Sequence, residues 1–388
     1  MIEKKTAWIA IVLVFLFSLI GSYSVFSIKT NGSIISPISS YKPPSNINGS
    51  NDVADNEPKT QECPINGAYY SKSQKAKWET RRPLGAMIEN HTEARPQSGL
   101  SSADVVFEAV AEGGITRFLA VFYCQDAPYI GPVRSTRIYF IRLLQGFGNY
   151  PLYAHVGGAN TPGPADALGE IRDLGWSGYN DLNQFSIPFP YYWRDFERLP
   201  DRANEHTVYS STTKLWQYAK DKRKLTNVDE DGISWDKNYE KWIFKDDENI
   251  DKRGDVAKID FGFWDNLASD FSVIWNYDKK NNQYLRVNGG QPHLDKNTGK
   301  QLTAKNVIIV FTKESPANDG YEGGHILYKI VGSGDSLIFQ DGKIIKGTWE
   351  KQKEENQIKF YDEKNNEVSL VRGAIWIEIL PIGNKVNY

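Results

Sequence analysis

The sequence predicts an α+β protein with two folded parts, an α/β domain over residues 80–222 and a mostly antiparallel β domain over residues 251–388. In the first part, strand-like alternation is interrupted by segments whose apolar residues recur every three or four positions, which is typical of helices. In the second part, the apolar segments are short and are separated by turn residues, which is typical of strands. Residues 223–250 are strongly charged and are expected to form a linker or an exposed extension.

The clearest element of the first part is a hairpin. Residues 104–111 alternate, with Phe107 on one side and Glu108 on the other, and residues 115–123 form a second apolar strand. Gly113-Gly114 lies between them and favours a tight reversal. Around this hairpin the sequence predicts strands at 83–89 and 151–156 and helices at 134–147, 164–174 and 211–222.

The second part also contains a hairpin signal. Asp341-Gly342 is a two-residue turn between two strand-like segments, and the longer loop 278–282 separates another pair. The strands expected in this part are 271–277, 283–287, 307–312, 326–331, 336–340, 343–349, 359–361, 368–370 and 374–380.

The N-terminal residues predict attachment to a membrane. Residues 7–28 carry no charge, and a helix of that length would span about 33 Å, which matches a bilayer core of about 30 Å. Lys4 and Lys5 favour a cytoplasmic N-terminus, so the rest of the chain is expected outside the cell membrane as a single-pass protein. The alternative is a cleaved signal peptide. Residues 29–62 are rich in Ser, Asn, Pro and Gly and are expected to be a flexible tether.

Two cysteines follow this N-terminal segment. Cys63 and Cys124 make an even count in a compartment expected to be oxidising, which favours one disulfide. Two unrelated buried thiols are the alternative.

Several functions are not supported by the sequence. A net charge of −2 gives no electrostatic case for nucleic-acid binding. No His-x-x-x-His or Cys-x-x-Cys pattern is present, so no metal site is predicted. No phosphate-binding loop ending in Lys-Ser or Lys-Thr is present either, so no nucleotide or other cofactor is predicted.

Long motifs in both parts resemble the YerB-like bacterial lipoproteins. These motifs are Arg82–Asn90, Ala94–Leu100, Glu112–Phe118, Gly131–Ser135, His155–Gly158, Tyr284–Gly289, Thr298–Thr303, Gly347–Trp349 and Trp376–Glu378. The resemblance covers residues 80–388 and implies a Gram-positive, extracytoplasmic, membrane-attached protein of two domains. It supplies no activity. The N-terminus departs from the family pattern, because a hydrophobic segment without a cysteine at its end replaces the lipidated cysteine.

The strongest candidate site contains three arginines. Arg134 and Arg137 are three residues apart at the expected start of a helix, where they would share one face, and Arg117 lies on a neighbouring strand. Helix N-termini favour anions, and guanidinium groups fit carboxylates and phosphates. A wall polymer with such groups would suit this site. The alternative is structural ion pairing with one of the acids Glu108, Glu112, Asp181 and Asp195.

Further candidate ligand contacts lie near the ends of expected elements. His155 ends a strand, and the carboxyl ends of strands are the usual ligand side of an α/β sheet. His206 precedes the last helix of the first part, and Asn90 ends one of the family-like motifs. The segment Tyr191–Asp195, with Arg194 and Asp195, would offer an aromatic platform for sugars or other rings. Structural histidines and core aromatic residues are the alternatives.

An enzymatic role would need an acid or base. Glu108 and Glu112 are four residues apart on a strand, about 13 Å, which exceeds the roughly 5–9.5 Å between the carboxyl groups of a glycosidase. Glu112 alone, or His155, therefore remains as the acid/base candidate. The sequence predicts a membrane-anchored extracytoplasmic protein that binds an anionic wall component or an envelope protein partner. The alternative is a cell-wall hydrolase or lytic enzyme.

Overall fold

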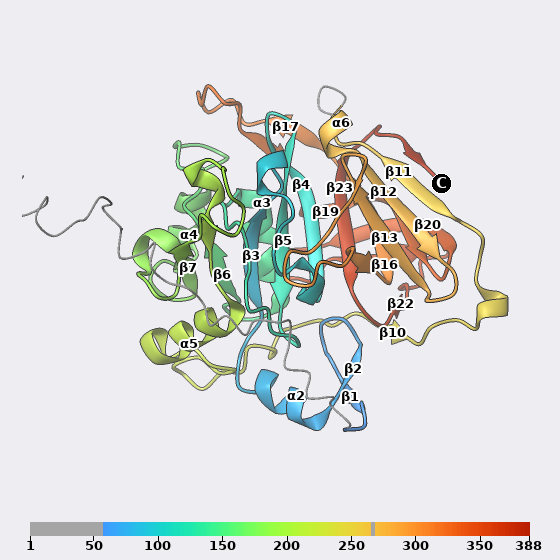
Figure 1. Ribbon diagram of the computed structural model, residues 1–388, viewed down its shortest axis with the longest axis horizontal. Coiled ribbons are helices and arrows are strands. Elements are labelled where there is room, and N and C mark those ends of the chain that lie inside the picture. The colour runs from blue at the N-terminus through green and yellow to red at the C-terminus, as the bar shows by residue number, and fades with distance from the viewer. Residues whose placement is uncertain (1–56, 265–267) are drawn as a thin grey trace, which may run out of the picture. The chain divides into compact units, whose positions relative to one another are not determined.

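A mixed ten-stranded sheet runs through the computed structural model, which describes residues 57–264 and 268–388 (Figure 1). The strand order is β21-β20-β19-β16-β23-β4-β5-β3-β6-β7. One half of this order comes from the predicted α/β part and the other half from the predicted β part. The two parts therefore share one sheet, which the sequence did not predict.

The first half of the sheet is built around the predicted hairpin. Its strands are β3 (Leu84–Glu89), β4 (Val105–Glu112), β5 (Ile115–Phe122), β6 (Leu152–His155) and β7 (Asp181–Asn183). β4 and β5 are antiparallel, and Gly113 and Gly114 between them both have positive φ. β3 is antiparallel to β5 and parallel to β6, which is parallel to β7. β3, β4, β6 and β7 therefore all run in one direction.

The second half contains two parallel pairings besides its hairpins. Its strands are β16 (Asn306–Thr312), β19 (Gly332–Gln340), β20 (Lys343–Lys351), β21 (Lys359–Asp362) and β23 (Ile375–Pro381). β19 and β20 form the hairpin predicted from Asp341-Gly342. β23 is parallel to β16 and also to β4, with Ile375 opposite Val105. The other pairings in this half are antiparallel, as predicted, and the two parallel ones both involve β23.

A second sheet packs against this junction. Its strands are β11 (Lys258–Phe261), β12 (Val273–Asp278), β13 (Gln283–Asn288), β14 (Gln291–Pro292), β15 (Thr303–Ala304) and β24 (Val386–Asn387). Trp275 of β12 lies against Trp376 of β23, with ring centroids 5.2 Å apart. The shorter strand pairs are β1 (Gln61–Glu62) with β2 (Tyr69–Tyr70), β8 (Trp193–Arg194) with β9 (Val208–Tyr209), β10 (Phe244–Lys245) with β22 (Leu370–Val371), and β17 (Glu314–Pro316) with β18 (Ile326–Tyr328).

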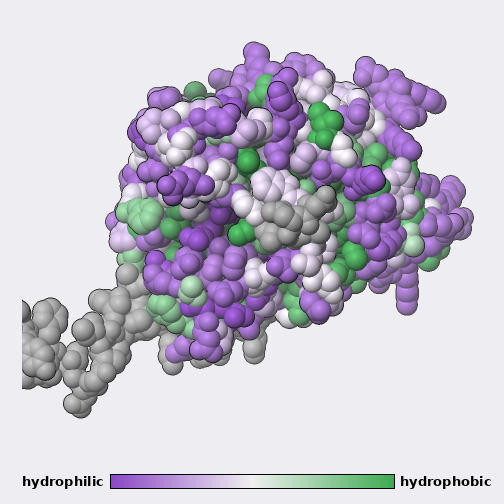
Figure 2. Space-filling model, turned by 90° about the horizontal axis from the view of Figure 1, so that it is seen from above, coloured by the Kyte–Doolittle hydropathy of each residue, from purple (hydrophilic) through white to green (hydrophobic). Residues whose placement is uncertain are grey.

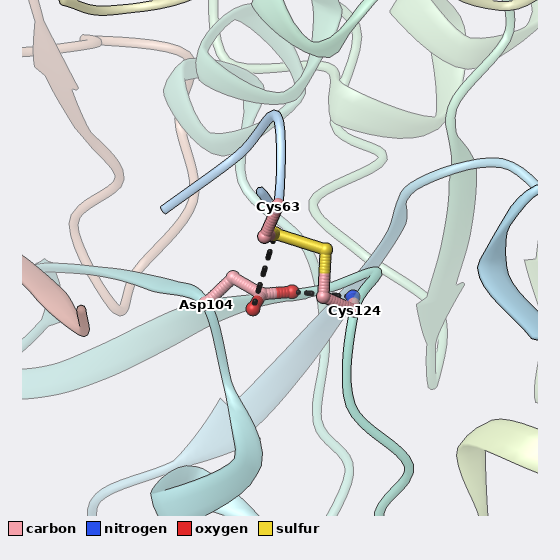
Figure 3. A group of neighbouring side chains, drawn as sticks. All are labelled: Cys63, Asp104 and Cys124. Atoms are coloured by element: carbon pink, nitrogen blue, oxygen red, sulfur yellow. Dashed lines mark hydrogen bonds between the residues drawn. A yellow bond between two sulfur atoms is a disulfide. The ribbon is translucent and has the colours of Figure 1, made fainter. Parts of the chain in front are cut away.

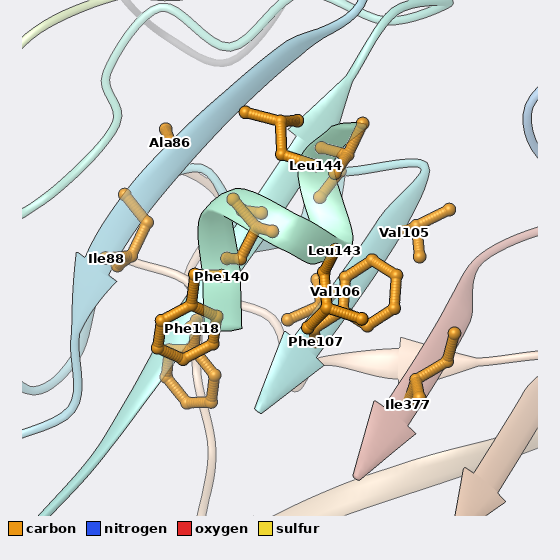
Figure 4. Close-up of a cluster of buried hydrophobic side chains, with 14 of the residues drawn as sticks. Ala86, Ile88, Val105, Val106, Phe107, Phe118, Phe140, Leu143, Leu144 and Ile377 are labelled. Carbon is orange, nitrogen blue, oxygen red and sulfur yellow. The ribbon is translucent and has the colours of Figure 1, made fainter. Parts of the chain in front are cut away.

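The described helices are short. They are α2 (Lys72–Trp78), α3 (Ile138–Leu144), α4 (Ala167–Asp173), α5 (Thr212–Arg223) and α6 (Ala268–Phe271). Of these, α3 packs on the sheet. Phe140, Leu143 and Leu144 of α3 point at the strands and are buried (Figure 4). Gly85 of β3 allows this close approach, because a Cβ there would lie 2.7 Å from Leu144 Cδ1. Each large apolar side chain buried in this way contributes about 1.5–3 kcal/mol.

The N-terminal predictions fall partly outside the described residues. The expected anchor at 7–28 and most of the expected tether at 29–62 lie there. Within the described residues no helix is long and apolar enough to cross a membrane. The last part of the expected tether belongs to the fold, because β1 pairs with β2 and Glu57 accepts a hydrogen bond from the Ser73 backbone N–H.

The charged segment 223–250 packs against the fold. Trp235 and Trp242 are both buried, and the indole N–H of Trp242 donates to the Ile358 carbonyl oxygen at 2.7 Å. The indole N–H of Trp235 donates to the Tyr123 hydroxyl at 3.2 Å. The segment connects the two parts, as a linker would, but its tryptophans contact both of them.

The predicted disulfide is present at the amino end of β4 (Figure 3). Cys63 is bonded to Cys124, which follows β5. The buried Asp104 carboxylate accepts the backbone N–H groups of Tyr123 and Cys124 at 2.7 and 2.9 Å, and burial raises its pKa to about 7. Cys63 Sγ lies 3.9 Å from Asp104 Oδ1, but a disulfide sulfur has no proton to donate.

Candidate functional site

Several polar side chains gather where parallel strands end. Because β3, β4, β6 and β7 run in one direction, Glu89, Glu112, His155 and Asn183 end their strands at one side of the sheet, which we call the carboxyl edge. This is the usual ligand side of an α/β sheet. Figure 2 looks onto this edge and shows a mostly hydrophilic surface with small hydrophobic patches.

The three predicted arginines meet at this edge, and we call Arg117, Arg134 and Arg137 the arginine cluster. Arg134 Nε donates to Glu89 Oε1 at 3.1 Å, and Arg137 Nε is hydrogen-bonded to Glu112. Arg117 donates from Nη1 to the Ser135 carbonyl oxygen at 2.8 Å. The Nε of Arg117 is buried and has no hydrogen-bond partner among the described residues.

Arg137 lies at the start of a helix, as the N-cap residue of α3, but Arg134 does not, which corrects the sequence prediction for Arg134. α3 begins at Ile138, and Arg137 before it has an extended backbone with φ −134° and ψ 151°. The Arg134 backbone N–H bonds to the Met87 carbonyl oxygen at 2.9 Å, and its carbonyl oxygen accepts from the Val156 N–H at 3.0 Å. These bonds to the ends of β3 and β6 replace the bonds that an earlier helix start would need.

Positive charge exceeds negative charge in the arginine cluster. Arg134 and Arg137 are each paired with one carboxylate, Glu89 and Glu112, whereas Arg117 feels both carboxylates only through space. Burial, together with the nearby Arg137, lowers the pKa of Arg117 to about 10, so it stays charged at neutral pH. Burial alone would raise the pKa of Glu112, but Arg137 outweighs burial and the pKa lies below its ordinary value. Glu112 is therefore a carboxylate at neutral pH and holds no proton to give as an acid.

His206 extends the polar group next to the arginine cluster. Its Nδ1 lies 2.9 Å from Glu89 Oε2, and this hydrogen bond raises the pKa of His206. Its Nε2 lies 3.4 Å from Glu93 Oε2. The ring of His91 stacks on that of His206 with centroids 4.9 Å apart. The prediction had included His206 but had missed Glu89, His91 and Glu93, although the strand-ending Ile88-Glu89-Asn90 was a signal for this edge.

His91, Glu93 and His206 are close enough together to be considered as metal ligands. The two imidazole rings are almost parallel, at 11°, so their in-plane lone pairs lie in separate planes and do not converge. His91 Nδ1 already accepts the Glu93 backbone N–H at 3.2 Å. This arrangement fits a shared hydrogen-bond network better than the tetrahedral geometry of a zinc site.

His155 is buried behind the carboxyl edge, where it cannot contact a ligand. Its Nε2 lies 2.7 Å from Asp181 Oδ1, and its Nδ1 lies 2.8 Å from the Gly157 carbonyl oxygen. Both ring nitrogens are therefore occupied, and His155 holds the loop after β6 in place. It is not placed to act as a free acid or base.

Asn90 and Asp195 also have structural contacts. Asn90 is fully buried and donates to Thr116 Oγ1 at 2.7 Å. Asp195 Oδ1 accepts the backbone N–H groups of Glu197 and Arg198 at 3.1 and 2.9 Å, which fixes the turn after β8. Neither side chain belongs to the arginine cluster.

Of the predicted aromatic platform, only the arginine lies next to the cluster. Tyr192 and Trp193 are buried, so their ring faces are not available to a ligand. Arg194 is half-buried and donates to Thr207 Oγ1 at 3.1 Å. Burial, and next the repulsion from Arg134, lower the pKa of Arg194. Arg194 thus places a fourth positive charge near the arginine cluster.

A second group of charges lies wholly inside the protein. Arg286 of β13 is fully buried and bonds to Glu108 of β4 and, at 3.0 Å, to Glu378 of β23. Burial raises the pKa of Glu378 well above its ordinary value, and the neighbouring Glu108 adds to this. Glu378 Oε2 meets no N–H or O–H donor from residues 57–264 and 268–388, which fits a proton on Glu378 shared with Glu108. This group, missed from the sequence, joins the two parts of the chain and does not face solvent.

Comparisons with known proteins agree with the sequence motifs. Residues 71–226 match the family described as protein of unknown function (DUF3048), N-terminal domain, and residues 263–377 match its C-terminal domain. The chain is 33% identical over 303 residues to the putative lipoprotein YerB of Bacillus subtilis (strain 168), which covers 78% of this chain and 82% of that protein. The crystal structure of YerB from Bacillus subtilis matches with a TM-score of 0.67 and 28% identity, over 85% of this chain and 100% of the other. The prediction of family membership is confirmed: the chain belongs to the YerB-like family, with both of its DUF3048 domains.

Proposed function

We propose that this chain is a membrane-attached extracytoplasmic envelope protein that binds an anionic ligand at the carboxyl edge. The observation that carries the proposal is the arginine cluster, where three guanidinium groups lie near two carboxylates and the buried Nε of Arg117 has no partner in the described part of the chain. The Arg134 side chain is 28% exposed, so a phosphate or carboxylate could approach it from solvent and balance the excess positive charge.

Two further observations support the proposed location. The disulfide between Cys63 and Cys124 is typical of proteins in oxidising compartments. The relative YerB is named a putative lipoprotein, which fits attachment to the outer face of a cell membrane. Attachment of this chain through residues 7–28 stays a prediction, since those residues lie outside the described part.

Binding is a better match to the geometry than hydrolysis. A lytic enzyme needs a protonated acid in its cleft, but Glu112 is ion-paired with Arg137 and has a lowered pKa. The other acid/base candidate, His155, is buried with both nitrogens occupied. Neither residue is therefore used in the proposed function as an acid or base.

Pelleting with purified cell-wall sacculi, with and without teichoic acid, tests the proposal. We expect the full chain to pellet more with the phosphate-bearing preparation and to be released by salt, which screens ionic contacts. Arg134→Ala should weaken pelleting, whereas Arg172→Ala, which removes an exposed arginine on α4, should not. Pelleting that ignores teichoic acid and salt would contradict the proposal, and released muropeptides would favour the hydrolase.

A further inference from the structure

One hydrophobic side chain is presented to solvent at the carboxyl edge. Phe185 is 77% exposed, more than any other large hydrophobic side chain in the described part of the chain. It lies in the 3-10 turn η4 (Gln184–Ser186), directly after β7. A single exposed aromatic side chain is ordinary on a protein surface, so its meaning depends on how it is held and on what lies beside it.

The backbone at Phe185 is fixed by its neighbours. Asn183 Oδ1 accepts two backbone N–H groups, that of Phe185 at 3.2 Å and that of Gly157 at 3.1 Å. Ser186 Oγ donates to the Asn183 carbonyl oxygen at 3.0 Å. One side chain therefore ties Phe185 to the loop that follows β6.

The ring of Phe185 lies against bare backbone. A Cβ added at Gly157 would be 2.9 Å from Phe185 Cε2, and Gly157 has a φ of +60°, which favours glycine. The glycine therefore both permits the turn and leaves room for the ring, while most of the ring surface stays open to solvent.

The same loop also holds the arginine cluster. The Gly157 carbonyl oxygen accepts the Thr136 N–H at 2.9 Å, and the Val156 N–H donates to the Arg134 carbonyl oxygen at 3.0 Å. β7, β6 and β3 are neighbours in the sheet, so the strand that precedes Phe185 and the strand that ends at Glu89 are about 10 Å apart, two strand spacings. A monosaccharide with one charged substituent is of comparable size.

We propose that Phe185 and the arginine cluster form the two halves of one site, and that its ligand is a saccharide carrying a phosphate or carboxylate. The apolar C–H face of the sugar packs on the Phe185 ring while its hydroxyls remain in water, and the acidic group meets the guanidinium groups. This inference rests on the proposed function, because it takes the arginine cluster as the anion site and adds the part that recognises the sugar ring.

The test compares ligands that carry each half of the recognition. The full chain, in a detergent without a sugar headgroup, is titrated calorimetrically with glucose 6-phosphate, glucuronate, inorganic phosphate and glucose. Phe185→Ala should weaken binding of glucose 6-phosphate by roughly three- to tenfold and leave inorganic phosphate unchanged. Arg134→Ala should weaken both. Tyr150→Ala removes an exposed ring just before the amino end of β6, at the opposite end of the strand from the carboxyl edge. This variant should bind glucose 6-phosphate and inorganic phosphate as wild type does.

The outcomes separate the two proposals. If Arg134→Ala weakens glucose 6-phosphate and Phe185→Ala does not, the saccharide inference is overturned and the anion site stands. If neither glucose 6-phosphate, glucuronate nor inorganic phosphate binds, both are overturned. Whichever of glucose 6-phosphate and glucuronate binds more tightly identifies the acidic group that the site takes. If glucose binds as tightly as both of them, the role of the arginine cluster in recognising an acidic group is overturned.

Discussion

Arg286 holds two buried acidic side chains that share a proton, and its replacement by leucine tests that account of the protein interior. The guanidinium bonds to Glu108, to Glu378 at 3.0 Å and to His293 Nδ1 at 3.0 Å. Removing one member of a buried ion pair costs about 3–5 kcal/mol, because the remaining charge is left without its partner. We expect Arg286→Leu to lower the free energy of unfolding by an amount in that range and not by twice as much, because a shared proton leaves Glu108 and Glu378 with one net negative charge.

Urea unfolding followed by tryptophan fluorescence measures this loss, since Trp376 and Trp275 lie 4.6 and 5.2 Å from the Arg286 guanidinium. The matched control is Glu378→Gln, which resembles the protonated acid and should cost less than about 1.5 kcal/mol at pH 7. An Arg286→Leu loss below about 1 kcal/mol, or equal losses in the two variants, would refute the reasoning.

The same control has a pH signature. The folded-state pKa of Glu378 is raised above its ordinary value of 4.5. The protonated Glu378 side chain therefore makes its full contribution to the free energy of unfolding below pH 4.5. It is lost as the pH rises from there through the folded-state pKa. Gln cannot ionise, so Glu378→Gln should cost more stability at pH 4 than at pH 7, and a cost that rises with pH would show that the sign is wrong.

Three further predictions concern stability. Replacing Cys63 and Cys124 by serine opens a loop with a sequence separation of 61 and should cost about 4 kcal/mol in urea unfolding; reduced wild type with the stability of the oxidised protein would contradict this. Trp242→Ala should cost about 3–5 kcal/mol in the same assay, because the indole is buried, and a loss below about 1 kcal/mol would mean that residues 223–250 form a loose linker. The hydrogen bond to Glu89 raises the pKa of His206 above 6.5. The protonated His206 therefore contributes fully to the free energy of unfolding below pH 6.5, and this contribution is lost as the pH rises through the folded-state pKa of His206. Unfolding measured from pH 5.5 to 8.5 should therefore show a smaller fall in His206→Gln than in wild type, and identical slopes would oppose it.

Local chemistry explains which elements could be predicted. Gly113-Gly114 and Asp341-Gly342 adopt positive φ values where hairpins require them, so both hairpins followed from a few neighbouring residues. The parallel pairing of β23 with β4 joins strands far apart in the sequence. No turn or periodicity records such a pairing, so the sheet shared by the two parts was not predicted.

In the candidate site, too, some features followed from neighbouring residues and others depended on distant contacts. The meeting of Arg117, Arg134 and Arg137 was predicted from their spacing. The predicted helix, however, begins only at Ile138, because distant backbone groups bind the segment at Arg134. The burial of His155 depends on Asp181, whose position only the folded sheet supplies. Residue type and spacing thus predicted the charge of the site, and tertiary contacts decided which side chains face it.

The disulfide lies beside the amino end of β4, and the arginine cluster lies at its carboxyl end, where Glu112 pairs with Arg137. A pull exerted between a ligand held at Arg134 and the chain entering at residue 57 would therefore run along the strands. Arg134 follows Cys124 by only ten residues, so the covalent chain from 124 to 134 would carry much of such a pull in place of the hydrogen bonds between strands. Because Cys63 is bonded to Cys124, the force would pass directly to the end of β5, and the entering segment could not be peeled away from the sheet first.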